Sequence, residues 1–206
     1  MSREDWYRNS EWNEMVAQDF FAKLRRARDK SQYLRIQASY LAKKHPDVSI
    51  ELIDQYFALG DHFDLASAHL VRATAFLSLG HTDEAIAAYE AALAQEELRP
   101  NLLTEAYIEL PFLIATQGLE IHFQRALFLL EKHKPRLMFS VDRFRWNAAQ
   151  ALIALAQGRG AEAAAYSRQA LDAATENHSG FRYHPGAGLV GKHHELLRAR
   201  LAQIAA

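Results

Sequence analysis

The fold is decided by residues 73–93, whose sequence is ATAFLSLGHTDEAIAAYEAAL. On both sides of Gly80, small and large apolar residues recur every three or four positions, the spacing that gathers side chains on one face of a helix. A glycine just past a helix end adopts the left-handed backbone conformation without the steric cost of a side chain. The stretch therefore predicts two antiparallel helices joined by a tight turn, with Thr82 or Asp83 capping the second helix.

Two alanines, Ala73 and Ala85, lie where the predicted helices cross. A small side chain lets two helices approach closely, and larger side chains then fill the space beside the crossing. Phe76, Tyr89 and Leu93 have the spacing to do so. The pair predicted here spans residues 65–98.

Three further stretches of the chain repeat this pattern less perfectly. A clear copy spans residues 141–175, a degenerate one spans 102–134, and a weaker helix pair spans 31–60. In the degenerate copy, Pro111 stands inside the predicted first helix, where its ring removes a backbone donor and predicts a kink. The alternative is a helix that begins later than residue 102. Recurrence at a nearly constant period is typical of helical repeat proteins.

The two ends of the chain complete an all-α prediction of one domain over residues 1–206. An unpaired helix over 11–30 precedes the repeats, a Gly- and Pro-rich loop follows at 176–190, and a capping helix spans 191–205. Trp6 and Trp12 either pack on the first helix or remain exposed as an interface patch.

Residues 73–80 and 83–93 resemble a tetratricopeptide repeat (TPR), and residues 141–171 resemble it nearly as well. The resemblance implies a right-handed α-solenoid of antiparallel helix pairs with capping helices at both ends, which binds a protein or peptide partner in a concave groove. It also implies which residues line that groove: Arg35, Ser39, Lys43, Leu70, Thr74, Glu105, Phe112 and Arg145. The cation and amide set with which some TPR proteins grip chaperone tails is not matched here.

Composition excludes several classes of function. The 24 Lys and Arg residues nearly balance the 25 Asp and Glu residues, so no long-range field attracts nucleic acid. The absence of cysteine excludes disulfides and thiolate chemistry and fits a cytoplasmic location. Residues 1–6 are charged and have no apolar stretch behind them, which argues against a secretory signal. The longest apolar runs, such as 110–115, are far shorter than the roughly 20 residues of a membrane span.

Motifs for chemistry are missing from the sequence. The histidines, among them His62 and the adjacent His193 and His194, do not have the spacing of a helical metal chelate and are predicted at the surface. Acids such as Glu96 are predicted to be solvated, and no phosphate-binding or nucleophile motif occurs. We predict no metal site, no cofactor and no enzymatic activity.

The most unusual segment is the loop around Phe181, Arg182, Tyr183 and His184. Either Phe181 and Tyr183 hold the loop against the last repeat while Arg182 caps a helix, or the loop binds a ligand or partner. We expect a protein-binding scaffold. The alternative is a ligand-sensing regulator or a neutralising partner of one enzyme or toxin, with the 180–188 loop at its site. Homodimerisation through an apolar end remains open.

Overall fold

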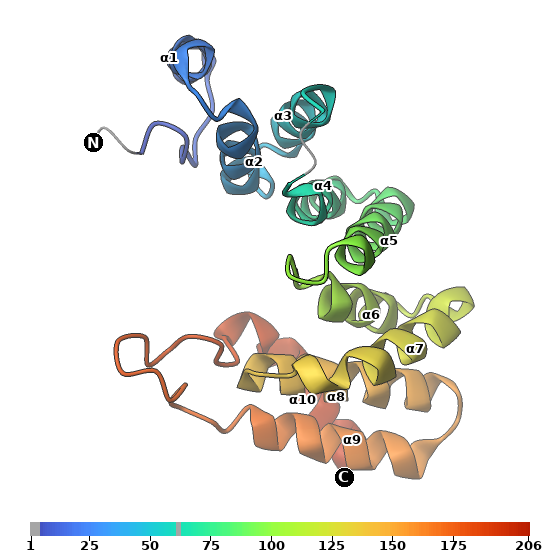
Figure 1. Cartoon of the computed structure of the whole chain (residues 1–206). Helices are drawn as coiled ribbons and strands as arrows, with labels where there is room; N and C mark the ends of the chain where they lie inside the picture. The colour runs from blue at the N-terminus through green and yellow to red at the C-terminus, as the bar shows by residue number, and fades with distance from the viewer. Residues whose placement is uncertain (1–4, 61–62) are drawn as a thin grey trace. The chain divides into compact units, whose positions relative to one another are not determined.

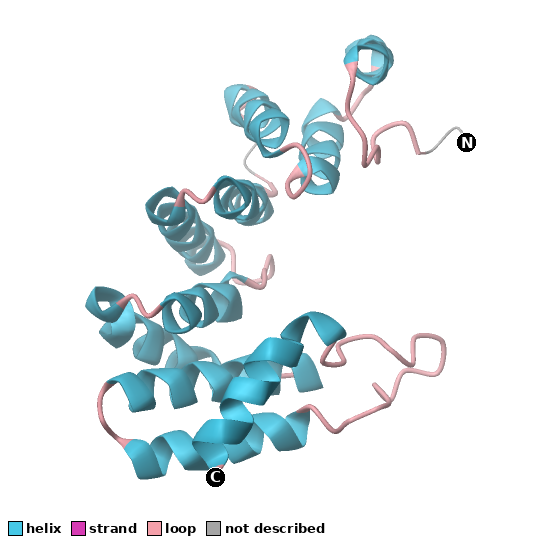
Figure 2. Ribbon diagram, turned by 180° about the vertical axis from the view of Figure 1, so that it is seen from behind, coloured by secondary structure: helices cyan, strands magenta, loops and turns pink. Residues whose placement is uncertain are grey.

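The computed structural model of the chain describes residues 5–60 and 63–206, and this described part consists of helices and loops without a strand (Figure 2). The all-α prediction is therefore confirmed for it. Residues 1–4, in the stretch predicted not to be a secretory signal, and His62, predicted at the surface, lie outside the described residues. The α-helices are α1 Glu14–Arg26, α2 Lys30–Leu41, α3 Pro46–Ala58, α4 Leu65–Leu79, α5 Thr82–Leu98, α6 Ala106–Gln117, α7 Phe123–His133, α8 Ser140–Ala156, α9 Gly160–Ala173 and α10 Glu195–Ala205. The short 3-10 helices of the described part are η1 Glu120–His122, η2 Lys134–Arg136 and η3 Lys192–His194.

The chain divides into two compact units, Met1–Ala106 and Tyr107–Ala206. A linear stack of helix pairs also divides in this way, because each pair contacts only its neighbours. The predicted single repeat domain therefore stays a prediction, and the two units are described separately.

The first unit is built from consecutive helices that pack on one another, α2 on α3, α3 on α4 and α4 on α5 (Figure 1). Ala73 of α4 and Ala85 of α5 are completely buried, and Tyr89 and Leu93 of α5 are buried beside them. These four residues have the burial expected of a close helix crossing. Phe76 differs, because it remains partly exposed at the surface of the pair.

The turn between α4 and α5 depends on Gly80. This residue has a φ of 78°, and its backbone N–H bonds to the carbonyl of Leu77 at 3.1 Å, while that of His81 bonds to Phe76 at 2.9 Å. The predicted left-handed helix end is thus confirmed. The predicted cap is wrong: His81 occupies the N-cap position of α5, and Thr82 is already the first helical residue.

We expect Gly80→Ala to lower the free energy of unfolding by roughly 1–2 kcal/mol, the usual cost of a side chain in the left-handed region. Gly160→Ala is the matched control, because Gly160 is the first residue of α9 and a Cβ there meets nothing within 4 Å. Alanine should be neutral or stabilising at that position. Urea denaturation followed by circular dichroism measures both changes, and equal effects would contradict the role given to Gly80.

Residues before α1 form a structured cap on the first helices. Trp6 and Trp12 pack inward against Phe20 of α1, with ring centroids 5.5 and 5.6 Å from its ring. The completely buried side-chain amide of Gln37 donates to the carbonyl of Asn9 at 2.7 Å and accepts its backbone N–H at 3.1 Å. Of the two alternatives for the tryptophans, the structure therefore has the packed one.

In the second unit, α8 packs on α9 and α9 packs on α10. Small residues again let the helices approach, because the shared core consists mainly of alanines around one aromatic ring and one leucine. Its buried members are Phe144, Ala148, Ala151, Ala170, Ala173 and Leu201. The predicted C-terminal capping helix corresponds to η3 and α10, and it covers this core through Leu201.

Two details of residues 96–117 differ from the sequence-based expectations. Glu96, predicted to be solvated, is 5% exposed. Its carboxylate accepts the backbone N–H of Thr104 at 2.7 Å and the hydroxyl of Thr104 at 2.6 Å, which shapes the turn before α6. Helix α6 begins at Ala106, later than predicted, yet Pro111 still lies inside it. The kink itself stays a prediction.

Candidate protein-binding surface

The groove residues predicted on the first repeat are largely engaged within the first unit. The guanidinium of Arg35 pairs with Asp64, just before α4, at 2.9 Å, and both side chains are at most 25% exposed. The hydroxyl of Ser39 donates to the carbonyl of Ile36 at 2.7 Å. Lys43 lies past the end of α2 and is exposed. Of these three predicted partner-binding residues, only Lys43 is an exposed cation.

Helix α4 is buried along two sides, which leaves two partly exposed strips between them. Each residue of a helix is rotated by about 100° from the preceding one, so Leu70 and Thr74 share one strip, while His69, Arg72 and Phe76 share another. Leu70 and Thr74 are both half-buried, and the Thr74 hydroxyl donates to the carbonyl of Leu70 at 3.1 Å. The two strips lie on different sides of α4, and the strip of His69, Arg72 and Phe76 lines a surface hollow.

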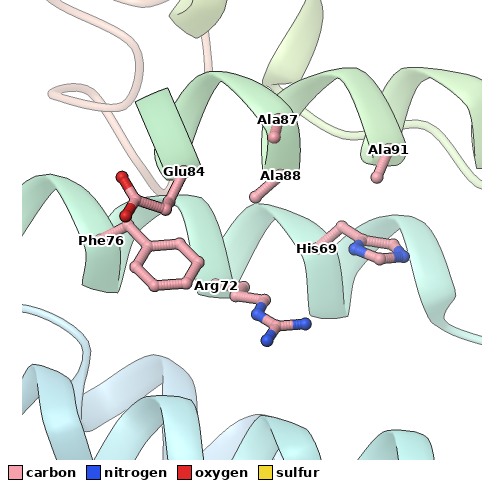
Figure 3. Close-up of a pocket in the computed structure, with 7 residues that line it drawn as sticks. All are labelled: His69, Arg72, Phe76, Glu84, Ala87, Ala88 and Ala91. Carbon is pink, nitrogen blue, oxygen red and sulfur yellow. The ribbon is translucent and has the colours of Figure 1, made fainter. Parts of the chain in front are cut away.

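The second strip borders a surface hollow of about 270 Å³ between α4 and α5 (Figure 3). Three alanines of α5, Ala87, Ala88 and Ala91, form the wall opposite His69, Arg72 and Phe76 of α4. Larger residues at the alanine positions would fill this space. Glu84 lies at one end of the hollow, one turn of α5 before Ala88.

Of the two charged side chains at the hollow, Arg72 is paired within the described part of the chain and Glu84 is not. Arg72 pairs with Asp54 of α3 at 3.1 Å, and its guanidinium lies over the rings of Phe57 and Phe76 at 5.6 Å. Burial, and secondarily the charge of Arg72, lowers the pKa of His69, so its ring is neutral at pH 7. Glu84 is exposed and forms no ion pair with any residue in the described ranges. The hollow is thus an apolar site with one uncompensated carboxylate.

A smaller polar hollow of about 120 Å³ lies in the same unit. Asp29, which borders it, accepts the backbone N–H of Gln32 at 3.1 Å and the hydroxyl of Ser31 at 3.1 Å. Asp64, also at its border, pairs with Arg35. Because these carboxylates are satisfied internally, this hollow offers a ligand less than the apolar one.

The remaining predicted groove residues lie around α6 and α8. Glu105 is exposed just before α6. In the second unit, Arg145 of α8 pairs with Glu109 of α6 at 2.7 Å, and its guanidinium lies 5.8 Å from the Phe112 ring. Arg145 is a mostly buried structural cation, its side chain 17% exposed.

His194, predicted at the surface, is buried instead, and only 5% of it is exposed. Its ring lies 5.0 Å from Phe144 and 5.8 Å from Phe112, with the His193 ring 4.1 Å away. Burial, followed by the charges of His193 and Arg145, lowers the pKa of His194 to about 4. The neutral imidazole of His194 therefore packs η3 against Phe112 of α6 and Phe144 of α8.

The base of the loop predicted over 176–190 is held against the repeat, whereas its tip is exposed and free to bind a partner. Its base is attached to α8, because the Gly188 carbonyl accepts the backbone N–H of Val141 at 2.9 Å and the hydroxyl of Ser140 at 3.0 Å. Phe181 lies 5.8 Å from Phe139 but remains 46% exposed.

The tip of the loop does not hold it against the repeat. Tyr183 is 78% exposed, so the expectation that it pins the loop is wrong. Arg182 lies over the Tyr183 ring at 5.3 Å, and His184 is exposed beside it. The tip therefore presents these side chains to solvent, which leaves the binding interpretation open.

Other kinds of site find little support in the described part of the chain. Across residues 5–60 and 63–206, no three His, Asp or Glu side chains gather closely enough to hold a metal ion. Within the same residues, no helix combines the length and apolar character that crossing a membrane requires. Arg182, Tyr183 and His184 are all exposed to solvent.

Comparisons with known proteins leave the resemblance to TPR proteins as a prediction. No family model, curated protein or solved structure matches this chain. The apolar hollow is therefore the candidate site on its own geometry. Sequence analysis missed it, although the run of alanines at 85, 87, 88, 91 and 92 could have indicated a thinly covered surface on α5.

Proposed function

We propose that this chain is a non-enzymatic, TPR-like α-solenoid module of the cytoplasm that binds a protein partner, and that the partner places an apolar side chain in the α4–α5 hollow. The hollow is the single observation that carries the proposal. A buried cavity of roughly 150 Å³ can hold a benzene ring, so a hollow of about 270 Å³ has room for an aromatic or large aliphatic side chain.

The chemistry of the hollow favours a protein partner over a small polar metabolite. Its walls are three alanine methyl groups, the phenyl ring of Phe76, the imidazole of His69 and the side chain of Arg72, which is paired with Asp54. Its only uncompensated charge among the described residues lies at one end, on Glu84. Protein interfaces characteristically bury an aromatic anchor in such a site and surround it with weaker contacts. Helices that pack in consecutive pairs supply the rigid surface on which the anchor binds.

The test is to select peptides from a random displayed library on the immobilised chain and to measure their affinity for two variants. Ala91→Phe fills the hollow, whereas Ala94→Phe adds the same ring at an exposed position of the same helix outside it. We expect Ala91→Phe to weaken binding at least about tenfold, since burying one aromatic side chain contributes roughly 1.5–3 kcal/mol. Ala94→Phe should bind like the unmodified chain.

Thermal unfolding of both variants provides the control for folding. Peptides that bind the two variants equally well would place the partner site elsewhere. A selection that yields no binding peptide would argue against a peptide-binding module altogether.

A further inference from the structure

The hollow and the tip of the 180–188 loop have complementary chemistry. The hollow provides an apolar space large enough for a ring and, at its end, the exposed carboxylate of Glu84. The loop tip provides two exposed rings, Phe181 and Tyr183, with the guanidinium of Arg182 between them in the sequence. Arg182 forms no ion pair within the ranges that the structure describes.

The loop tip is also ordered by its own hydrogen bonds. The backbone N–H of Ser179 bonds to the carbonyl of Pro185 at 2.9 Å, and its hydroxyl donates to the carbonyl of His184 at 2.7 Å. These bonds close residues 179–185 into a compact turn that projects the exposed Tyr183 ring. A segment already held in one conformation loses less entropy when it binds.

We propose that the α4–α5 hollow of one copy of this chain receives the 180–184 loop tip of a second copy, with the Tyr183 ring in the hollow and Arg182 paired with Glu84. This inference rests on the proposed function, because it uses the same hollow and names its occupant. The site and the inserted segment are different surfaces, so the contact is heterologous.

The first experiment uses a fluorescent peptide with the sequence of residues 177–188, titrated with the whole chain and followed by anisotropy. We expect saturable binding that Ala91→Phe weakens at least about tenfold, while Ala94→Phe leaves it unchanged. Glu84→Lys should weaken binding of this peptide by about tenfold, and a peptide with Arg182→Glu should lose binding to the unmodified chain similarly. When the Glu84→Lys chain is titrated with the Arg182→Glu peptide, the ion pair is re-formed with its charges exchanged, and most of the affinity should return.

The second experiment measures association of whole chains by sedimentation velocity at increasing protein concentration. We expect reversible self-association, which Ala91→Phe and Tyr183→Ser each reduce. The Ala91→Phe chain keeps its loop ring, and the Tyr183→Ser chain keeps its open hollow. When the two variants are mixed, the loop of the first can enter the hollow of the second, so we expect mixed dimers. Mixed dimers would support the heterologous contact, and a mixture that stays monomeric would overturn it.

The outcomes separate this inference from the proposed function. If library-selected peptides require the open hollow but the 177–188 peptide does not bind and whole chains do not associate, the second copy is not the partner and the protein-binding function stands. If neither binds at the hollow, both proposals fail. A chain that stays monomeric at every concentration tested would also overturn the inference.

Discussion

Phe20→Ala should lower the free energy of unfolding by about 3–5 kcal/mol, the usual cost of removing a fully buried phenyl ring. Phe20 is completely buried, and its ring contacts Trp6, Trp12 and Phe21 at centroid distances of 5.3–5.6 Å. Removing it leaves a cavity between α1 and the N-terminal cap. Urea denaturation measures the loss, and stronger acrylamide quenching of tryptophan fluorescence should show that Trp6 and Trp12 become accessible.

Phe21→Ala is the matched control for this prediction. Phe21 follows Phe20 directly and is only partly buried, so its removal should cost less than half as much. Equal losses from the two substitutions, or a loss below about 1 kcal/mol from Phe20→Ala, would show that the N-terminal cap contributes little to the fold.

Acid should destabilise the second unit through His194. The pKa of this histidine falls from its ordinary value of 6.5 to about 4 in the folded chain, so the unfolded chain binds a proton more readily than the folded one. The stabilisation from the neutral ring is complete above pH 6.5 and is lost as the pH falls toward 4. Because proton binding and unfolding are linked, this pKa shift should lower the free energy of unfolding by about 2 kcal/mol between pH 7 and 5, and by about 3 kcal/mol between pH 7 and 4.

The measurement is the free energy of unfolding from urea denaturation at pH 7, 6, 5 and 4. His194→Phe removes the titrating group and keeps an aromatic ring, so we compare pH slopes rather than absolute stabilities. The slope between pH 7 and 5 should become markedly flatter in His194→Phe. His193→Gln, a change at the exposed neighbour, should keep most of the slope. An unchanged slope in His194→Phe would show that protonation of the buried His194 does not cause the loss of stability in acid.

The helix pairs could be predicted because their signals lie within short stretches of sequence. Residues 73–93 contain both helix faces, the turn glycine and the crossing alanines, and the structure has Ala73 and Ala85 buried and Gly80 left-handed. The N-cap of α5 was missed, since a turn residue can shift by one position without changing the apolar pattern.

The candidate site could not be predicted in the same way. Periodicity shows that α4 has an apolar side, but it does not show which exposed strip lies beside a thin wall of alanines. The partners of Arg35 and Arg145 are 29 and 36 residues away in sequence, so nothing local indicated that these two predicted partner-binding cations are internally paired. The burial of His194 was missed for the same reason, because the rings that cover it, Phe112 and Phe144, are distant in sequence. The burial of Glu96 was missed although its partner Thr104 is only eight residues away, because periodicity does not show how the chain turns between them.

Local sequence was enough for the presence of the helices, the left-handed turn at Gly80 and the crossing alanines of α4 and α5, because these signals lie within the short stretch 73–93. Tertiary packing decided which cations are paired, which histidines have a lowered pKa and where the surface is hollow. Each of these depends on side chains that only the packing of separate helices brings together, and on the space that remains between them.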